Sequence, residues 1–120
     1  MRPELHDQAL LLDMLDSAKA VVEMASGLTE AGYAADRRTR RAVEREIEII
    51  GEAARKVSQA FQDAHPQVPW RKIMAQRHKL AHEYAEIQDE IVWRVATVHI
   101  PELIAQLEPL IIPFPTQPDD

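Results

Sequence analysis

The sequence lacks cysteine altogether, so it can form neither a disulfide nor a thiolate metal site. A chain without a disulfide framework suits a reducing compartment, and we expect a cytoplasmic protein. Glycine is also scarce, at three residues, and aromatic residues make up only 5% of the chain. The apolar residues, 46% of the total, are mostly Ala, Leu, Ile and Val, a composition typical of a helical bundle.

Long hydrophobic runs are absent too. No segment approaches the roughly 20 apolar residues that span a bilayer. The N-terminal "MRPELHDQALLLDML" is interrupted by Asp13 and Asp16, which indicates an amphipathic helix and not a signal peptide. We therefore expect a soluble protein without a membrane partner.

Positive charge is in the minority, with 14 Lys and Arg against 20 Asp and Glu and a net charge of −6. This balance excludes a generally basic nucleic-acid clamp, so any RNA contact must come from a local patch. The only strongly basic stretch is "DRRTRRAVEREIE", which offers four candidate contacts to an RNA backbone: Arg37, Arg38, Arg40 and Arg41. The acidic residues that follow favour the competing interpretation, a solvated helix face with mixed ion pairs.

Four main helical segments are expected, with a short fifth helix possible in the connector "SGLTEAGYAAD". The first runs from about Leu5 to Met24 and has a wide apolar stripe. The second begins after Asp36, a good N-cap residue. Its apolar positions recur at intervals of four and three, as in a bundle seam: Val43, Ile47, Ile50, Ala54, Val57 and Phe61.

The second half of the chain is divided by prolines. "HPQVPW" separates a third helix, from Trp70 to about His82, and "EYAEIQ" links it to a fourth, residues 89–111. Pro101 lies inside the fourth helix and should kink it. Residues 1–112 are thus expected to form one antiparallel all-α bundle, and the proline-rich residues 113–120 a flexible tail.

The stretch "RHKLAHEY", residues 77–84, is the densest group of reactive side chains. On a straight helix, Arg77 and Tyr84 lie about 20° apart in azimuth and about two turns apart, whereas His82 lies about 140° from Arg77. One straight helix therefore cannot gather the three side chains. Either the helix breaks near His82, or a second chain completes the site, as at the axis of a two-fold dimer.

These residue types suit metal-free RNA cleavage. A histidine takes and gives a proton near neutral pH, an arginine holds phosphate oxygens, and a tyrosine hydroxyl positions a substrate. Together they would activate a ribose 2′-OH and stabilise the charge that its attack adds to phosphorus. No carboxylate cluster with two-metal spacing is apparent, so no metal is expected.

Other interpretations of the motif remain open. His78 and His82 have the spacing of a zincin pair, but Lys79 stands where the zincin glutamate would be. A histidine near a helix end also interacts with the helix dipole without any catalytic role. Tyr84 is equally suited to the edge of a core.

"RHKLAHEY" resembles the R-x4-H-x-Y motif of HepT-type toxins in the HEPN superfamily of helical ribonuclease-related domains. The segments "AVEREIEIIGEAARKVS", "PQVPWRKI", "IVWRV" and "IPELI" occur in the order and at the spacing usual for that family. The resemblance implies that Arg77 and His82 are catalytic, with His78 beside them at a place where the family often has Asn. Within "GEAARK", Glu52 and Lys56 match the family's E-x3-K element and would be supporting residues.

The resemblance also implies partners. HepT-type proteins form homodimers with a composite cleft, and higher assemblies with a nucleotidyltransferase antitoxin, MntA. It implies that the antitoxin transfers AMP from ATP onto Tyr84, and that the toxin itself needs no cofactor. An adenylate there would oppose an RNA phosphate by volume and charge. The alternative is a non-catalytic HEPN module that serves as partner or substrate of a nucleotidyltransferase.

Overall fold

The computed structural model of the chain describes residues 3–75 and 85–112, and this part is entirely helical apart from its turns. The elements in chain order are α1 (Pro3–Ala25), α2 (Glu30–Ala35), α3 (Arg37–Lys56), α4 (Gln59–Ala64), a helix over residues 70–75, α6 (Ala85–Arg94), a π-helical turn (Val95–His99), α7 (Ile100–Leu107) and a 3-10 turn (Glu108–Leu110). The predicted all-α fold is confirmed. The expected fifth helix is α2.

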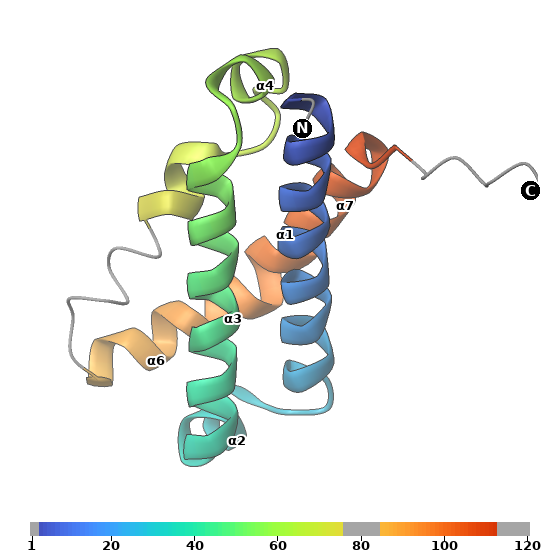
Figure 1. Cartoon of the computed structure of the whole chain (residues 1–120). Coiled ribbons are helices and arrows are strands. Elements are labelled where there is room, and N and C mark those ends of the chain that lie inside the picture. The colour runs from blue at the N-terminus through green and yellow to red at the C-terminus, as the bar shows by residue number, and fades with distance from the viewer. Residues whose placement is uncertain (1–2, 76–84, 113–120) are drawn as a thin grey trace, which may run out of the picture.

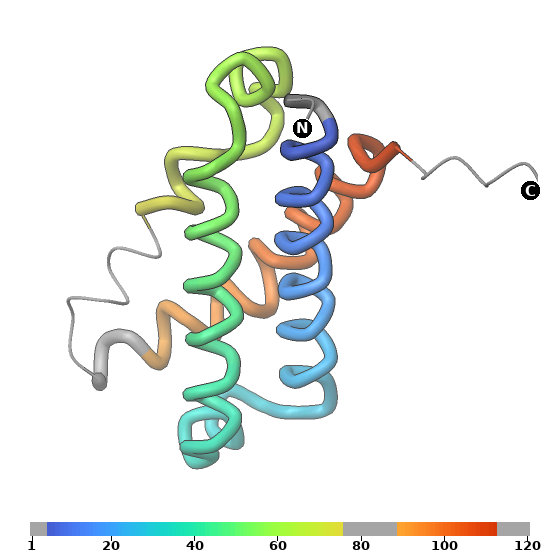
Figure 2. Tube along the Cα trace, in the orientation of Figure 1, coloured from blue at the N-terminus to red at the C-terminus, as the bar shows by residue number. Residues whose placement is uncertain are grey.

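The two long helices α1 and α3 lie side by side and antiparallel, while α6 and α7 cross the pair diagonally (Figure 1). The short helices α2 and α4 lie at opposite ends of that pair (Figure 2). Each long element contributes fully buried side chains to one core: Leu11, Met14 and Val21 from α1, Val43 and Ile50 from α3, and Val92 and Leu107 from α6 and α7. The apolar seam predicted from Val43 to Val57 is therefore confirmed.

The second helix is shorter than its apolar periodicity predicted. The chain turns extended at Val57, whose ψ is 138°, and Ser58 becomes the N-cap of α4. The buried carboxylate of Asp7 on α1 accepts hydrogen bonds from the Ser58 backbone N–H, at 2.8 Å, and from its hydroxyl, at 2.7 Å. The bond from the Ser58 N–H replaces the one that a continuous helix would make to the Ala54 carbonyl, and the seam ends here. The prediction that Phe61 continues this seam was wrong, since it lies on α4.

The last helical run begins at Ala85, four residues earlier than predicted, because residues 85–88 are helical and not part of a link. The disturbance expected near Pro101 takes the form of the π-helical turn, in which the Ile100 N–H bonds to the Val95 carbonyl. A proline has no N–H and its ring presses on the carbonyl four residues before it. One wider turn just upstream accommodates that ring, as π-bulges do elsewhere.

The end of the described chain is fastened to α1 by one side chain. The Gln8 amide donates to the Leu110 carbonyl at 2.9 Å and accepts from the Ile112 N–H at 2.8 Å. The proposed tail, residues 113–120, lies outside the described residues. None of the helices in residues 3–75 and 85–112 is long and apolar enough to cross a membrane.

Replacing Gly27 with Ala should lower the free energy of unfolding by about 1–2 kcal/mol. Gly27 has a φ of 81° in the turn after α1, and an added Cβ would meet nothing within 4 Å. The cost is therefore backbone strain alone. Urea unfolding measures it, and Gly27→Asn is the matched control because Asn tolerates positive φ better than Ala does. Equal stability of Gly27→Ala and the natural protein would contradict the prediction.

Candidate functional site

The four motif residues Arg77, His78, His82 and Tyr84 lie outside the described residues, so the structure shows only what holds the chain on either side of them. The helix over residues 70–75 leads into the motif, and α6 starts directly after it. These two helices flank the motif in the sequence, and each is held by contacts within the described part of the chain.

The entry to the motif is anchored by Trp70, which is 6% exposed. Its indole N–H donates to the His65 carbonyl at 3.0 Å, and the Phe61 ring meets it edge-on with centroids 6.3 Å apart. Val68, just before the helix, is also buried. The start of this helix therefore has a fixed place against α4 and the loop after it.

The exit from the motif is anchored through α6. Asp89 pairs with Arg40 of α3 at 3.6 Å, and both side chains are about a quarter exposed (27% and 22%). One turn further, Val92 is fully buried and the Trp93 ring packs on Tyr33 of α2. An ion pair and two apolar contacts thus hold α6 against α2 and α3.

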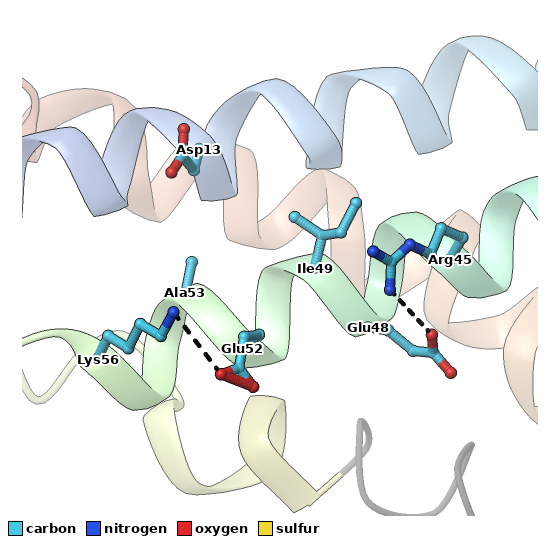
Figure 3. Close-up of a pocket in the computed structure, with 7 residues that line it drawn as sticks. All are labelled: Asp13, Arg45, Glu48, Ile49, Glu52, Ala53 and Lys56. Atoms are coloured by element: carbon cyan, nitrogen blue, oxygen red, sulfur yellow. Dashed lines mark ion pairs between the residues drawn. The ribbon is translucent and has the colours of Figure 1, made fainter.

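Glu52 and Lys56, the expected supporting residues, both line a polar cavity of about 440 Å³ between α1 and α3, here called the α1–α3 groove (Figure 3). The Glu52 carboxylate accepts a hydrogen bond from Arg55 at 2.7 Å and lies 3.9 Å from the Lys56 ammonium. Hydrogen bonding to Glu52 raises the pKa of the Arg55 guanidinium. The two side chains of the E-x3-K pair therefore lie together, as a spacing of four on a helix requires, and their supporting role stays a prediction.

Three further charged residues of this groove were missed by the sequence reasoning. Arg45 pairs with Glu48 at 3.6 Å on α3, and Asp13 approaches from α1 (Figure 3). The spacing of four between Glu48, Glu52 and Lys56 places them on one helix face and could have revealed Glu48. Asp13 could be assigned to the groove only once the packing of α1 on α3 was known.

The basic run separates into two groups. Arg37 and Arg38 are exposed, and Arg41, with a side chain 67% exposed, pairs with Glu44 at 3.6 Å. Arg40 differs, because it donates to the Ala34 carbonyl and pairs with Asp89. Arg40 thus joins α2, α3 and α6. An RNA contact stays a prediction for all four arginines, with Arg40 the least available.

Burial raises the pKa of the Glu44 carboxyl, and Asp89 adds to the effect, while Arg41 and Arg40 oppose it. The folded state then binds this proton more tightly than the unfolded state, so stability falls as pH rises through the folded pKa. Glu44→Gln should therefore be more stable than the natural protein near pH 7, and the difference should vanish below the pKa of Glu44. Urea unfolding across a pH series measures it. A difference independent of pH would contradict this prediction.

No three His, Asp or Glu side chains within the described ranges lie close enough together to hold a metal ion. The metal-free character of the motif itself stays a prediction, since its histidines are not among those residues. The α1–α3 groove, with two cations and three carboxylates, is suited to orienting polar groups by charge-assisted hydrogen bonds.

The fold defines the class of protein: an all-α bundle of the HEPN-like type. The family model described as ribonuclease HepT-like matches residues 14–110. The chain therefore belongs to the HepT-like ribonuclease family, and the class of enzyme is a ribonuclease.

Relatives of known name agree with this family. A protein of Methanocaldococcus jannaschii named as a candidate RNase is 33% identical over 91% of this chain and 90% of its own length. A protein of Thermococcus cleftensis named as a candidate ribonuclease HepT is 31% identical over 83% of this chain and 91% of its own. No solved structure matches the chain.

Proposed function

We propose that this chain is the toxin of a HepT/MntA toxin–antitoxin pair, a metal-independent endoribonuclease that acts through Arg77 and His82. The observation that carries the proposal is the family match over residues 14–110, which includes the whole of "RHKLAHEY". The anchored helices on both sides of the motif support it, because a catalytic pair needs a fixed frame.

In the proposed reaction His82 takes the proton from a ribose 2′-OH, and the 2′-oxygen attacks the adjacent phosphorus. The bond to the 5′-oxygen breaks, a 2′,3′-cyclic phosphate forms, and the leaving oxygen receives a proton from imidazolium. Arg77 stabilises the negative charge that develops on the phosphate, and Tyr84 positions it. No redox partner or metal takes part in this step.

The site is proposed to be composite. The azimuth of His82 on a straight helix is about 140° from that of Arg77, so a second copy of the chain is the simplest source of the missing half. His78, beside Arg77, and the Glu52–Lys56 pair would support the site. The exposed Arg37, Arg38 and Arg41 would contact the RNA backbone at a distance from the cleavage point.

Regulation is proposed to act on Tyr84. A nucleotidyltransferase antitoxin would attach AMP from ATP to its hydroxyl, releasing pyrophosphate, and the adenylate would exclude an RNA phosphate by volume and charge. The competing function is a non-catalytic binding module, in which the same modification would change only a protein contact.

Incubation with an MntA-type antitoxin and ATP should add AMP to the peptide that contains Tyr84 and abolish RNA cleavage. Tyr84→Phe lacks the acceptor hydroxyl, so the cleavage rate that it retains without the positioning hydroxyl should be the same before and after this treatment. The chain has only two tyrosines, and the other, Tyr33, is fully buried and serves as an internal control. Mass spectrometry of the two tyrosine peptides measures the outcome.

Two results would contradict parts of this proposal. AMP on any residue other than Tyr84 would remove the regulatory half. A folded dimer that binds the antitoxin but cleaves no RNA before modification would favour the binding module.

A further inference from the structure

A second cavity, of about 520 Å³, lies on α6 and the π-helical turn, with Glu30 of α2 on its edge. It is here called the α6 groove. Trp93 and Arg94 line it together with Glu90, and none of these three has a part in the proposed reaction. The groove is therefore distinct from both the motif and the α1–α3 groove.

Trp93 is a fixed aromatic surface in this groove. It is half-buried, and the Tyr33 ring packs against it with centroids 5.3 Å apart at an interplanar angle of 37°. The backbone carbonyl of Trp93 accepts a hydrogen bond from the Thr97 hydroxyl at 2.8 Å, which ties the backbone of α6 to the π-helical turn. A rigid tryptophan that lines an open groove loses little entropy when another flat ring stacks on it.

The charges around Trp93 suit a base better than a run of phosphates. Arg94 is exposed and forms no ion pair within the part of the chain that the structure describes, so it is available for one phosphate. Glu30 and Glu90 are both exposed on the groove and would repel a continuous polyanion. Their carboxylates can instead accept hydrogen bonds from the exocyclic amino group of a nucleobase.

The groove also lies close to the motif along the chain. Trp93 follows Tyr84 by nine residues, and α6 begins at Ala85. From Ala85, the first residue after the motif, the helical rise per residue gives about 12 Å along the axis to Trp93, near enough for one strand of RNA to reach both the motif and the groove.

We propose that the α6 groove binds an unpaired nucleobase of single-stranded RNA. The base stacks on Trp93, Arg94 holds an adjoining phosphate, and Glu30 or Glu90 accepts from the base amino group. This inference rests on the proposed function for its substrate class and adds to it a site that selects which strand is presented to the motif.

The test uses the fact that the chain has only two tryptophans. Trp70→Phe removes the buried one and leaves Trp93 as the sole tryptophan, and His82→Ala in the same chain prevents cleavage. A short oligoadenylate should quench Trp93 emission saturably, whereas a ribose-phosphate oligomer without bases should not. Arg94→Ala should weaken binding, while Arg71→Ala, an exposed arginine outside the groove, should leave it unchanged.

Variants at Trp93 provide a second measurement that does not depend on fluorescence. Trp93→Leu should weaken oligoadenylate binding by about tenfold, the size expected for one base–aromatic stack, and Trp93→Phe should restore part of it. Partial rescue by Phe separates stacking from simple packing. Circular dichroism confirms that both variants are folded.

The outcomes distinguish this inference from the proposed function. Cleavage of RNA by the natural protein, together with unchanged Trp93 emission of the Trp70→Phe, His82→Ala variant at saturating RNA, would overturn the nucleobase site and leave the ribonuclease intact. Base-dependent quenching in that variant, together with no cleavage by the natural protein, would support the nucleobase site and count against the catalytic proposal. Free AMP tests the alternative occupant, a single adenylyl group in place of a base of an RNA strand. Quenching by AMP at lower concentration than oligoadenylate would assign the groove to an adenylyl group and overturn its assignment to RNA.

Discussion

RNA cleavage by the His82→Ala variant should fall by about 10²- to 10⁴-fold, the contribution typical of a general acid–base residue. Imidazole is the only kind of group in "RHKLAHEY" with an ordinary pKa near neutrality. The other imidazole, His78, lies four residues from His82, so it does not take the place of His82 at the reacting hydroxyl. Arg77→Ala should have a comparable effect, because the charge on the phosphate would lose its main partner. A fluorogenic RNA with initial-rate measurement follows both variants.

The controls for this experiment are contained in the same chain. His6 is an exposed histidine on α1, so His6→Ala should cleave at the natural rate. Excess EDTA should leave the natural rate unchanged if no metal takes part. Sedimentation should show that His82→Ala keeps the natural assembly state. A His82→Ala rate within a few-fold of the natural one would refute the catalytic assignment.

Replacing Asp7 with Ala should cost about 2–3 kcal/mol of folding free energy, the largest stability effect expected outside the apolar core. The Asp7 carboxylate is 4% exposed and accepts both the backbone N–H and the hydroxyl of Ser58. In the Ala variant the Ser58 N–H and hydroxyl lose their carboxylate acceptor in a partly buried place. The first residue of the α4 cap is then no longer held against α1. Urea unfolding monitored by circular dichroism measures the loss.

Asp7→Asn is the matched variant, since its amide oxygen can still accept the Ser58 N–H and its amide nitrogen can donate to the hydroxyl. It should lose clearly less stability than Asp7→Ala. Ser58→Ala removes one hydrogen bond and the N-cap of α4 and should cost about 1 kcal/mol. Equal losses in all three variants would show that the hydrogen bonds do not determine the helix break.

The sequence by itself determined the helical class. Glycines are few, and the apolar residues recur at intervals of three and four, a pattern that forms one buried face when the chain is helical. The seam from Val43 to Val57, the α1 stripe and the cap at Asp36 followed from local patterns alone. The motif and the family also followed from the order of residues. These features depend on neighbours within one or two helical turns, which a sequence displays directly.

Only the tertiary structure decided the features that join distant parts of the chain. The break after Lys56 depends on Asp7, and Asp13 reaches the α1–α3 groove from another helix. In the sequence Arg40 is indistinguishable from its basic neighbours, and only the fold places Asp89 beside it. No local pattern predicted the contact between the Tyr33 and Trp93 rings. The physical reason is that a hydrogen bond, an ion pair or a ring contact between remote residues is set by how helices pack, which the periodicity within each helix does not specify.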